Sequence, residues 1–169
     1  MHCDICDAPM RERRATAKAP YYYVLGGLPH VGLVGITVYE CPGHSVSPVI
    51  PRIGELHRVI AGTFVSKPGP LTGAELRFLR KNVGLSAQKF AALLVVDPAH
   101  LSRVENGKQR ALGPSTDRLA RLIVTGFARG GEEVRKLLLA EAADRIERRK
   151  QTKTVATFKH EKNRWKVAA

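Results

Sequence analysis

The spacing of hydrophobic residues changes near residue 70, and the change divides the chain into a strand-rich part and a helical part. Apolar residues alternate with other residues over positions 34–38, which predicts a strand at 35–39. A second strand is expected at 21–25, where tyrosine is concentrated, and a glycine-containing loop would join the two. Residues 51–62 predict one short helix.

The segment SKPGP at residues 66–70 predicts a linker, because two prolines and a glycine interrupt any regular structure. Apolar residues at helical spacing begin directly after this linker. Thr72 and Glu75 have the spacing of a capping box. Ser86 is expected to cap a second helix, and Asp97 a third, in which proline takes the first position. The apolar spacing predicts a fourth helix at residues 115–124, which would bury Leu119, Leu122 and Ile123 and end at Gly126. A fifth helix is expected at 132–150.

The net charge suggests what kind of partner the protein binds. The chain has 28 Lys and Arg against 15 Asp and Glu, which gives +13 at pH 7 and predicts a polyanionic partner. Residues 145–169 are the most basic segment, and we expect this tail either to contact the backbone of nucleic acid or to act as a solvated, solubilising segment. No apolar run approaches the roughly 20 residues that a membrane span requires. With three cysteines and no apolar signal region after Met1, a reducing, cytoplasmic location is expected.

Residues 85–108, LSAQKFAALLVVDPAHLSRVENGK, have the plan of two short helices joined by a tight turn. The segment resembles the helix-turn-helix of the Cro/repressor class, and the resemblance extends over residues 71–124. Two positions depart from that pattern. Val95 occupies the turn position where glycine is usual, which predicts an altered or strained turn, because a β-branched residue tolerates positive φ poorly. Ala87 occupies a position often held by glutamine, with Gln88 one place later.

The second helix of this pair is the candidate recognition helix. Leu101 and Val104 should face the core, which leaves Ala99, His100 and Arg103 toward the major groove. Arg103 is the strongest candidate for a base contact, because its planar fork matches guanine O6 and N7. The alternative is a helical pair that contacts only protein, with Arg103 bonded to Glu105 or solvent. Phosphate contacts are expected from the flanking residues Ser86, Gln88, Asn106, Lys108 and Arg110.

A metal site is predicted by two short motifs that lie far apart in the sequence. Cys3 and Cys6 form a Cys-x-x-Cys knuckle, and Cys41 and His44 repeat its spacing around Pro-Gly. Together they predict one structural zinc ion per chain; iron in the same ligand shell is an alternative. Two further alternatives are a redox-active Cys3–Cys6 pair, and a fourth ligand other than His44, namely His2, His30 or water. A catalytic zinc is not expected, because no general base lies near these residues.

The order of these motifs resembles the MqsA/YgiT-type antitoxin family over residues 1–125. The motifs are a Cys-x-x-Cys, a tyrosine-rich strand pair, a second knuckle beginning Cys-Pro, a short helix and then LTGAELRFLRKNVGLS. The resemblance implies a structural zinc domain that binds a small ribonuclease toxin, and a dimeric domain that binds a palindromic DNA operator in its own promoter. The histidine at position 44 departs from the family's usual four cysteines. A solitary transcriptional regulator without a toxin is the alternative function.

We therefore expect an α+β fold, with a small zinc-binding β-hairpin domain followed by an all-α helix-turn-helix domain and a C-terminal helix. The expected boundaries are a zinc-binding domain at 1–65, a linker at 66–70, a helix-turn-helix domain at 71–128, and a basic helix and tail at 129–169. An enzyme is not expected, since no catalytic constellation surrounds the cysteines or His57. His57 is expected to pack or cap a short helix.

Overall fold

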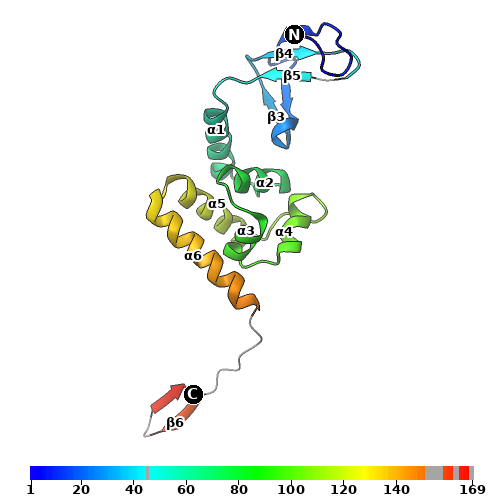
Figure 1. Cartoon of the computed structure of the whole chain (residues 1–169). Helices are drawn as coiled ribbons and strands as arrows, with labels where there is room; N and C mark the ends of the chain where they lie inside the picture. The colour runs from blue at the N-terminus through cyan, green and yellow to red at the C-terminus, as the bar shows by residue number, and fades with distance from the viewer. Residues whose placement is uncertain (45, 151–157, 162–163, 168–169) are drawn as a thin grey trace.

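The computed structural model describes residues 1–44, 46–150, 158–161 and 164–167. Small antiparallel sheets precede a set of helices, and helix α1 leads from one to the other (Figure 1). This α+β arrangement confirms the expected fold class. None of the helices in the described part of the chain combines the length and apolar character that crossing a bilayer requires. The strands are β1 (Arg11–Arg14), β2 (Tyr21–Tyr23), β3 (Leu28–Leu33), β4 (Thr37–Glu40), β5 (Val46–Val49), β6 (Phe158–Glu161) and β7 (Arg164–Val167). The helices are α1 (Ile53–Ser66), α2 (Gly73–Asn82), α3 (Ala87–Leu94), α4 (Pro98–Glu105), α5 (Pro114–Arg129) and α6 (Gly131–Lys150).

The strand pairing differs from the expected hairpin. Strand β2 pairs with β3, and β4 pairs with both β1 and β5 in a separate three-stranded sheet. The segment LPHVGL was not expected to be a strand because it contains proline and glycine. It still forms β3, because each strand of a two-stranded sheet has one edge without a ladder partner. The missing N–H of Pro29 is tolerated at such an edge. Val38, at the centre of β4, is fully buried.

Helix α1 is longer than the predicted segment at 51–62. It extends over 14 residues to Ser66 and buries Ile60 and Phe64. Gly62 does not end it, because the buried residues Ile60 and Phe64 anchor the helix on both sides of this position. Phe64 packs edge-on against Phe78 of α2, with ring centroids 5.9 Å apart. Tertiary packing has therefore outweighed the low helix propensity of glycine.

The predicted helix starts are confirmed by their capping bonds. Thr72 and Glu75 form the reciprocal capping box of α2. Ser86 Oγ accepts the backbone N–H of Lys89 at the start of α3. Asp97 Oδ1 accepts the N–H of Ala99, 2.8 Å away, at the start of α4. Each cap satisfies N–H groups that a helix leaves without a partner in its first turn.

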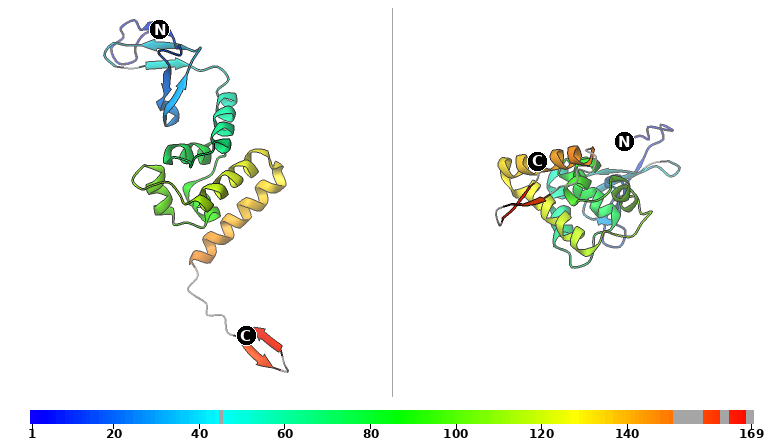
Figure 2. Two further views of the ribbon diagram at one scale, coloured as in Figure 1. Left: turned by 180° about the vertical axis from the view of Figure 1, so that it is seen from behind. Right: turned by 90° about the horizontal axis from the view of Figure 1, so that it is seen from below.

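Helix α5 was expected to end at Gly126 and to bury Leu122, and both expectations were wrong. The helix continues to Arg129, and Leu122 is 70% exposed. Ile123 is buried as predicted, and it shares its face with Ala120, Val124 and Phe127. Gly126 lies inside the helix because α6 packs closely there: a Cβ at this position would be 3.2 Å from Cδ1 of Leu138. Helix α6 packs against both α5 and α3 (Figure 2).

A buried ion pair joins the first helix of the helical part to the candidate recognition helix. Arg80 donates from Nε and Nη2 to the two carboxylate oxygens of Glu105, each at 2.7 Å, and from Nη1 to the carbonyl oxygen of Leu85. Both side chains are less than a tenth exposed. Glu105 is thus engaged with Arg80 and not with Arg103. This two-point contact fixes α4 relative to α2.

Candidate metal centre and nucleic-acid interface

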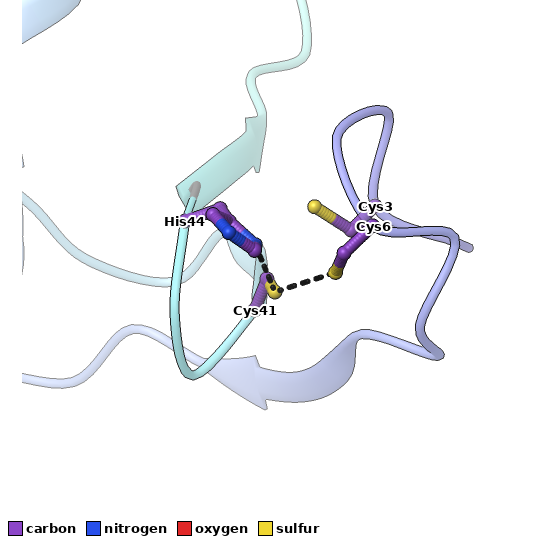
Figure 3. A group of neighbouring side chains, drawn as sticks. All are labelled: Cys3, Cys6, Cys41 and His44. Atoms are coloured by element: carbon purple, nitrogen blue, oxygen red, sulfur yellow. Dashed lines mark hydrogen bonds between the residues drawn. The ribbon is translucent and has the colours of Figure 1, made fainter.

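The two predicted knuckles meet in space although Cys6 and Cys41 are 35 positions apart in the sequence. Cys3 and Cys6 lie on the loop before β1, and Cys41 and His44 lie on the loop between β4 and β5 (Figure 3). Pairing of β1 with β4 brings these loops together, with Arg11 opposite Glu40, which directly precedes Cys41. The local sequence supplies the ligands, and the sheet register supplies their proximity.

The four side chains lie close enough together to hold one metal ion. Their ligand atoms all lie within 4.8 Å of one another. Cys6 Sγ is 3.7 Å from Cys41 Sγ, and Cys41 Sγ is 3.6 Å from His44 Nδ1. In a regular tetrahedron with metal–sulfur bonds of about 2.3 Å and metal–nitrogen bonds of about 2.0–2.1 Å, these edges would measure about 3.8 Å and about 3.6 Å. The residues present therefore fit one metal ion.

The alternative fourth ligands have other contacts. His2 Nδ1 lies 3.4 Å from Asp7 Oδ1, and His30 Nε2 lies 3.4 Å from Glu75 Oε1 of helix α2. His30 also stacks on Phe64. Cys3 and Cys6, the alternative redox pair, are not joined by a disulfide bond. The geometry thus groups all three cysteines with His44.

The thiols of this cluster need a cation when they ionise together. The backbone N–H of Ala8 lowers the pKa of Cys6, but desolvation and the neighbouring Cys41 and Cys3 thiols outweigh it, so the pKa lies above its ordinary value. A bound divalent ion would remove this penalty by stabilising the thiolates. Cys3 and Cys41 are buried with Met10 in a cluster separate from the main core. So small an apolar cluster contributes little stability without a further constraint such as a metal.

Helix α4 presents one apolar and one polar face, as the sequence predicts. Leu101 and Val104 are 0% and 1% exposed, against the core. Ala99 and Arg103 are exposed and His100 is half-buried. The helix is rigidly held at its start by Asp97 and near its end by Glu105. The Arg103 and His100 side chains therefore extend from a fixed support.

The flanking candidates for phosphate contacts lie at both ends of this unit. Ser86 and Gln88 are exposed in the first turn of α3, and Lys108 and Arg110 are exposed after α4. The Asn106 side chain is engaged within the protein: its Oδ1 accepts from Arg77 Nη1 at 3.2 Å, and its Nδ2 donates to the Ser102 carbonyl at 2.7 Å. Gln88 also borders a cavity of about 840 Å³ between the α3–α4 turn and α6.

The turn between α3 and α4 keeps the left-handed conformation that glycine normally supplies. Val95 ends α3 with φ 57° and ψ 37°. Its side chain is 66% exposed and therefore gains little from packing. The prediction of a strained turn agrees with this geometry, because a β-branched residue is disfavoured at positive φ.

Gln109 is a polar residue of this surface that the sequence pattern did not predict. Its Oε1 lies 2.8 Å from His100 Nδ1 and 3.1 Å from Arg103 Nε, so one oxygen bridges the two leading candidates for base contacts. A signal was present in Asn106-Gly107, since a glycine just after a helix turns the chain back over the last helical turn.

Comparison with known proteins agrees with the helical part of this geometry. Residues 72–137 match a family model described as a helix-turn-helix domain. The match covers α2 to α5 and the start of α6, so the two helices α3 and α4 belong to a helix-turn-helix. No curated protein and no solved structure matches the chain.

Proposed function

We propose that this protein is a non-enzymatic transcriptional regulator that binds double-stranded DNA through α4 and holds one structural zinc ion at its N-terminal end. The observation that carries the proposal is the exposed Arg103 on a helix whose opposite face, Leu101 and Val104, is buried in a helix-turn-helix domain. A side chain so held enters the major groove with its direction fixed. The net charge of +13 supports a polyanionic partner.

Zinc is the proposed occupant of the Cys3, Cys6, Cys41 and His44 site. Three thiolates and one imidazole are the ligand set of closed structural zinc sites, and the tetrahedral edges support this choice. The ion would hold the N-terminal loop to the β4–β5 loop. All four positions would be taken by protein, which leaves none for a reacting water.

Binding as a homodimer to a palindromic operator is the arrangement we propose for the DNA complex. Two copies of α4 would read major grooves about 34 Å apart on one face of the duplex. Ser86, Gln88, Lys108 and Arg110 would contact phosphates and so set the register. The exposed Leu122 of α5 and Leu137 of α6, 70% and 71% exposed, offer apolar side chains for the dimer contact.

We further propose that the regulator is the antitoxin of a toxin–antitoxin pair and neutralises a small ribonuclease. Support comes from the order of the two knuckles, the strand pair and the helix-turn-helix, which resembles the MqsA/YgiT-type family. A solitary regulator with the same DNA-binding surface is the second candidate. Coexpression with the product of the adjacent reading frame separates them: relief of growth arrest by this chain supports the antitoxin, and its absence favours the solitary regulator.

DNA binding is tested by fluorescence anisotropy with duplexes from the region upstream of its own gene. Arg103→Ala is expected to weaken binding to the selected duplex about 5- to 150-fold, the range of about 1–3 kcal/mol for loss of a base contact. Arg14→Ala is the matched control, since it removes the same charge from an exposed position on β1. Equal affinities of the two variants for this duplex would contradict base reading by Arg103.

A further inference from the structure

The loop after α4 is folded back over the recognition helix by a defined turn. Gly107 has φ 70°, its N–H donates to the carbonyl of Val104, and the Lys108 N–H donates to the carbonyl of Arg103 at 2.8 Å. These two bonds are those of a Schellman motif. The Gln109 N–H also donates to the Arg103 carbonyl, at 3.2 Å. The backbone therefore holds the Gln109 side chain beside the exposed side chains of α4.

The atom that Gln109 shares between its two neighbours must be the amide oxygen. Arginine Nε always carries a hydrogen and has no lone pair to accept one, so the group 3.1 Å from Arg103 Nε must be an acceptor. That requirement fixes the orientation of the Gln109 amide, with its oxygen toward Arg103. The same oxygen lies 2.8 Å from His100 Nδ1. His100 Nδ1 must then carry a hydrogen as well.

This shared oxygen sets which groups α4 offers to DNA. With its hydrogen on Nδ1, a neutral His100 has a lone pair on Nε2 and acts there as an acceptor. Within the described residues, Arg103 uses Nε for its bond to Gln109, and its two terminal amino groups remain as a fork of donors. The fork matches guanine O6 and N7, whereas an acceptor matches the amino group of adenine or cytosine in the major groove.

We propose that Gln109 is a positioning residue that fixes this donor and acceptor pattern, so that the operator half-site has a guanine for Arg103 beside an adenine or cytosine amino group for His100. The proposal rests on the proposed DNA-binding function and names the bases it reads. Gln109 acts through His100 and Arg103. Its removal should change selectivity among sequences more than the general attraction to DNA.

The histidine tautomer is tested without DNA, by nitrogen-15 NMR of the imidazole in the full-length protein at a pH where His100 is neutral. The unaltered protein is expected to show His100 with its hydrogen on Nδ1. Gln109→Leu, which keeps the size but removes the acceptor, should shift the hydrogen to Nε2, the form that free imidazole side chains prefer. Gln109→Glu retains an acceptor oxygen and should preserve the Nδ1 form. An Nε2 hydrogen in the unaltered protein would overturn the proposal.

Base selectivity is tested with a randomised 20-base-pair duplex library, followed by affinity measurements on selected and scrambled duplexes over a range of potassium chloride concentrations. Gln109→Leu is expected to lower the ratio of selected to scrambled affinity about tenfold and to leave the salt slope unchanged. Lys108→Ala, the contrasting variant, should weaken both duplexes alike and reduce the salt slope.

The two experiments separate failure of this inference from failure of the proposed function. If Gln109→Leu keeps the same ratio of selected to scrambled affinity as the unaltered protein, the role of Gln109 is overturned while DNA binding stands. A protein that selects no sequence from the library would overturn the proposed function and the base pattern with it. Selected half-sites that carry no guanine at the position read by Arg103 would contradict the base pattern.

Discussion

Arg121 of α5 donates from Nη2 to the carbonyl oxygen of Gly69, 2.6 Å away, and so joins two segments that are 52 residues apart in the sequence. Its Nη1 donates to the carbonyls of Phe64, Val65 and Lys67. Asp117 completes the arrangement by bonding Arg121 Nε at 2.8 Å and the backbone N–H of Leu71. The segment predicted as a linker is therefore held by α5 over its length.

Arg121→Ala should destabilise the protein by about 3 kcal/mol, because it leaves the buried Asp117 without its cation and four carbonyl groups without a donor. The free energy of unfolding in urea measures this change. Arg118→Ala, at an exposed position of the same helix, should change it by no more than about 0.5 kcal/mol. Equal effects of the two substitutions would show that the contacts of Arg121 do not stabilise the fold.

Val95→Gly should stabilise the protein by about 0.5–1 kcal/mol. The substitution relieves a β-branched residue at φ 57° and sacrifices little packing, since the valine is largely exposed. Val59→Gly is the matched control: it removes another exposed valine, but from within α1, and should destabilise by about 0.5–1 kcal/mol. Urea unfolding of both variants checks the opposite signs, and a loss of stability in Val95→Gly would contradict the strained turn.

Gly73→Ala should destabilise the protein by at least about 2 kcal/mol. A Cβ at this position would lie 1.9 Å from the carbonyl oxygen of Val104, so α2 and α4 would have to move apart. Gly54→Ala provides the comparison, because nothing lies within 4 Å of its added Cβ in α1. Thermal unfolding of the two variants should give a lower melting temperature for Gly73→Ala alone.

Protonation of Glu75 should lower the stability of the protein at acid pH. Burial raises its pKa, but hydrogen bonds from Lys67 Nζ and the Thr72 N–H, at 2.6 Å and 2.7 Å, outweigh burial and hold the pKa below its ordinary value. A carboxyl group with a lowered folded-state pKa contributes stability above its unfolded value of about 4.3, and this contribution is lost as pH falls through the folded value.

The pH effect is measured as the free energy of urea unfolding between pH 7 and pH 3. Gln at position 75 does not titrate, so Glu75→Gln should show a smaller fall in stability over the acid part of this range. Glu12→Gln, at an exposed position on β1, should follow the unaltered protein. Parallel curves for all three proteins would contradict the role assigned to Glu75.

Helix starts could be predicted from the sequence because capping is local. Thr72, Ser86 and Asp97 each bond a backbone N–H within three residues, so the necessary partner is always nearby in the sequence. The same locality explains why Cys3 and Cys6, like Cys41 and His44, were identified as pairs. The spacing within each knuckle is set by a single turn, so a short stretch of sequence is enough to recognise it.

Strand pairing and the buried face of α5 could not be predicted from local patterns. The partner of β2 depends on register across a turn, where Gly27 at φ 74° lets β3 follow directly after a short helical turn. In α5, the small residue Ala120 is fully buried while Leu122 is exposed. Hydrophobic spacing favours large residues at buried positions, whereas close packing between helices also selects small ones, as α6 does at Gly126.

The DNA-reading surface was predicted only in part for the same reason. Arg103 and His100 follow from helical periodicity, but Gln109 contacts them through a turn that reverses the chain. Arg80 and Glu105, which hold α4 in place, are 25 residues apart and come together only in the folded protein. The residues that hold a site in place are therefore harder to predict from the sequence than the residues of the site itself, because their contacts form only in the folded chain.

Native mass spectrometry of the full-length protein, alone and with its promoter duplex, tests metal binding and DNA binding together, with Cys41→Ser and Arg103→Ala beside it. One zinc ion per chain and two chains per duplex are expected, with the ion lost in Cys41→Ser and a smaller fraction of duplex complex in Arg103→Ala. A metal-free chain that forms no complex with the promoter would contradict the proposal of a zinc-stabilised DNA-binding regulator.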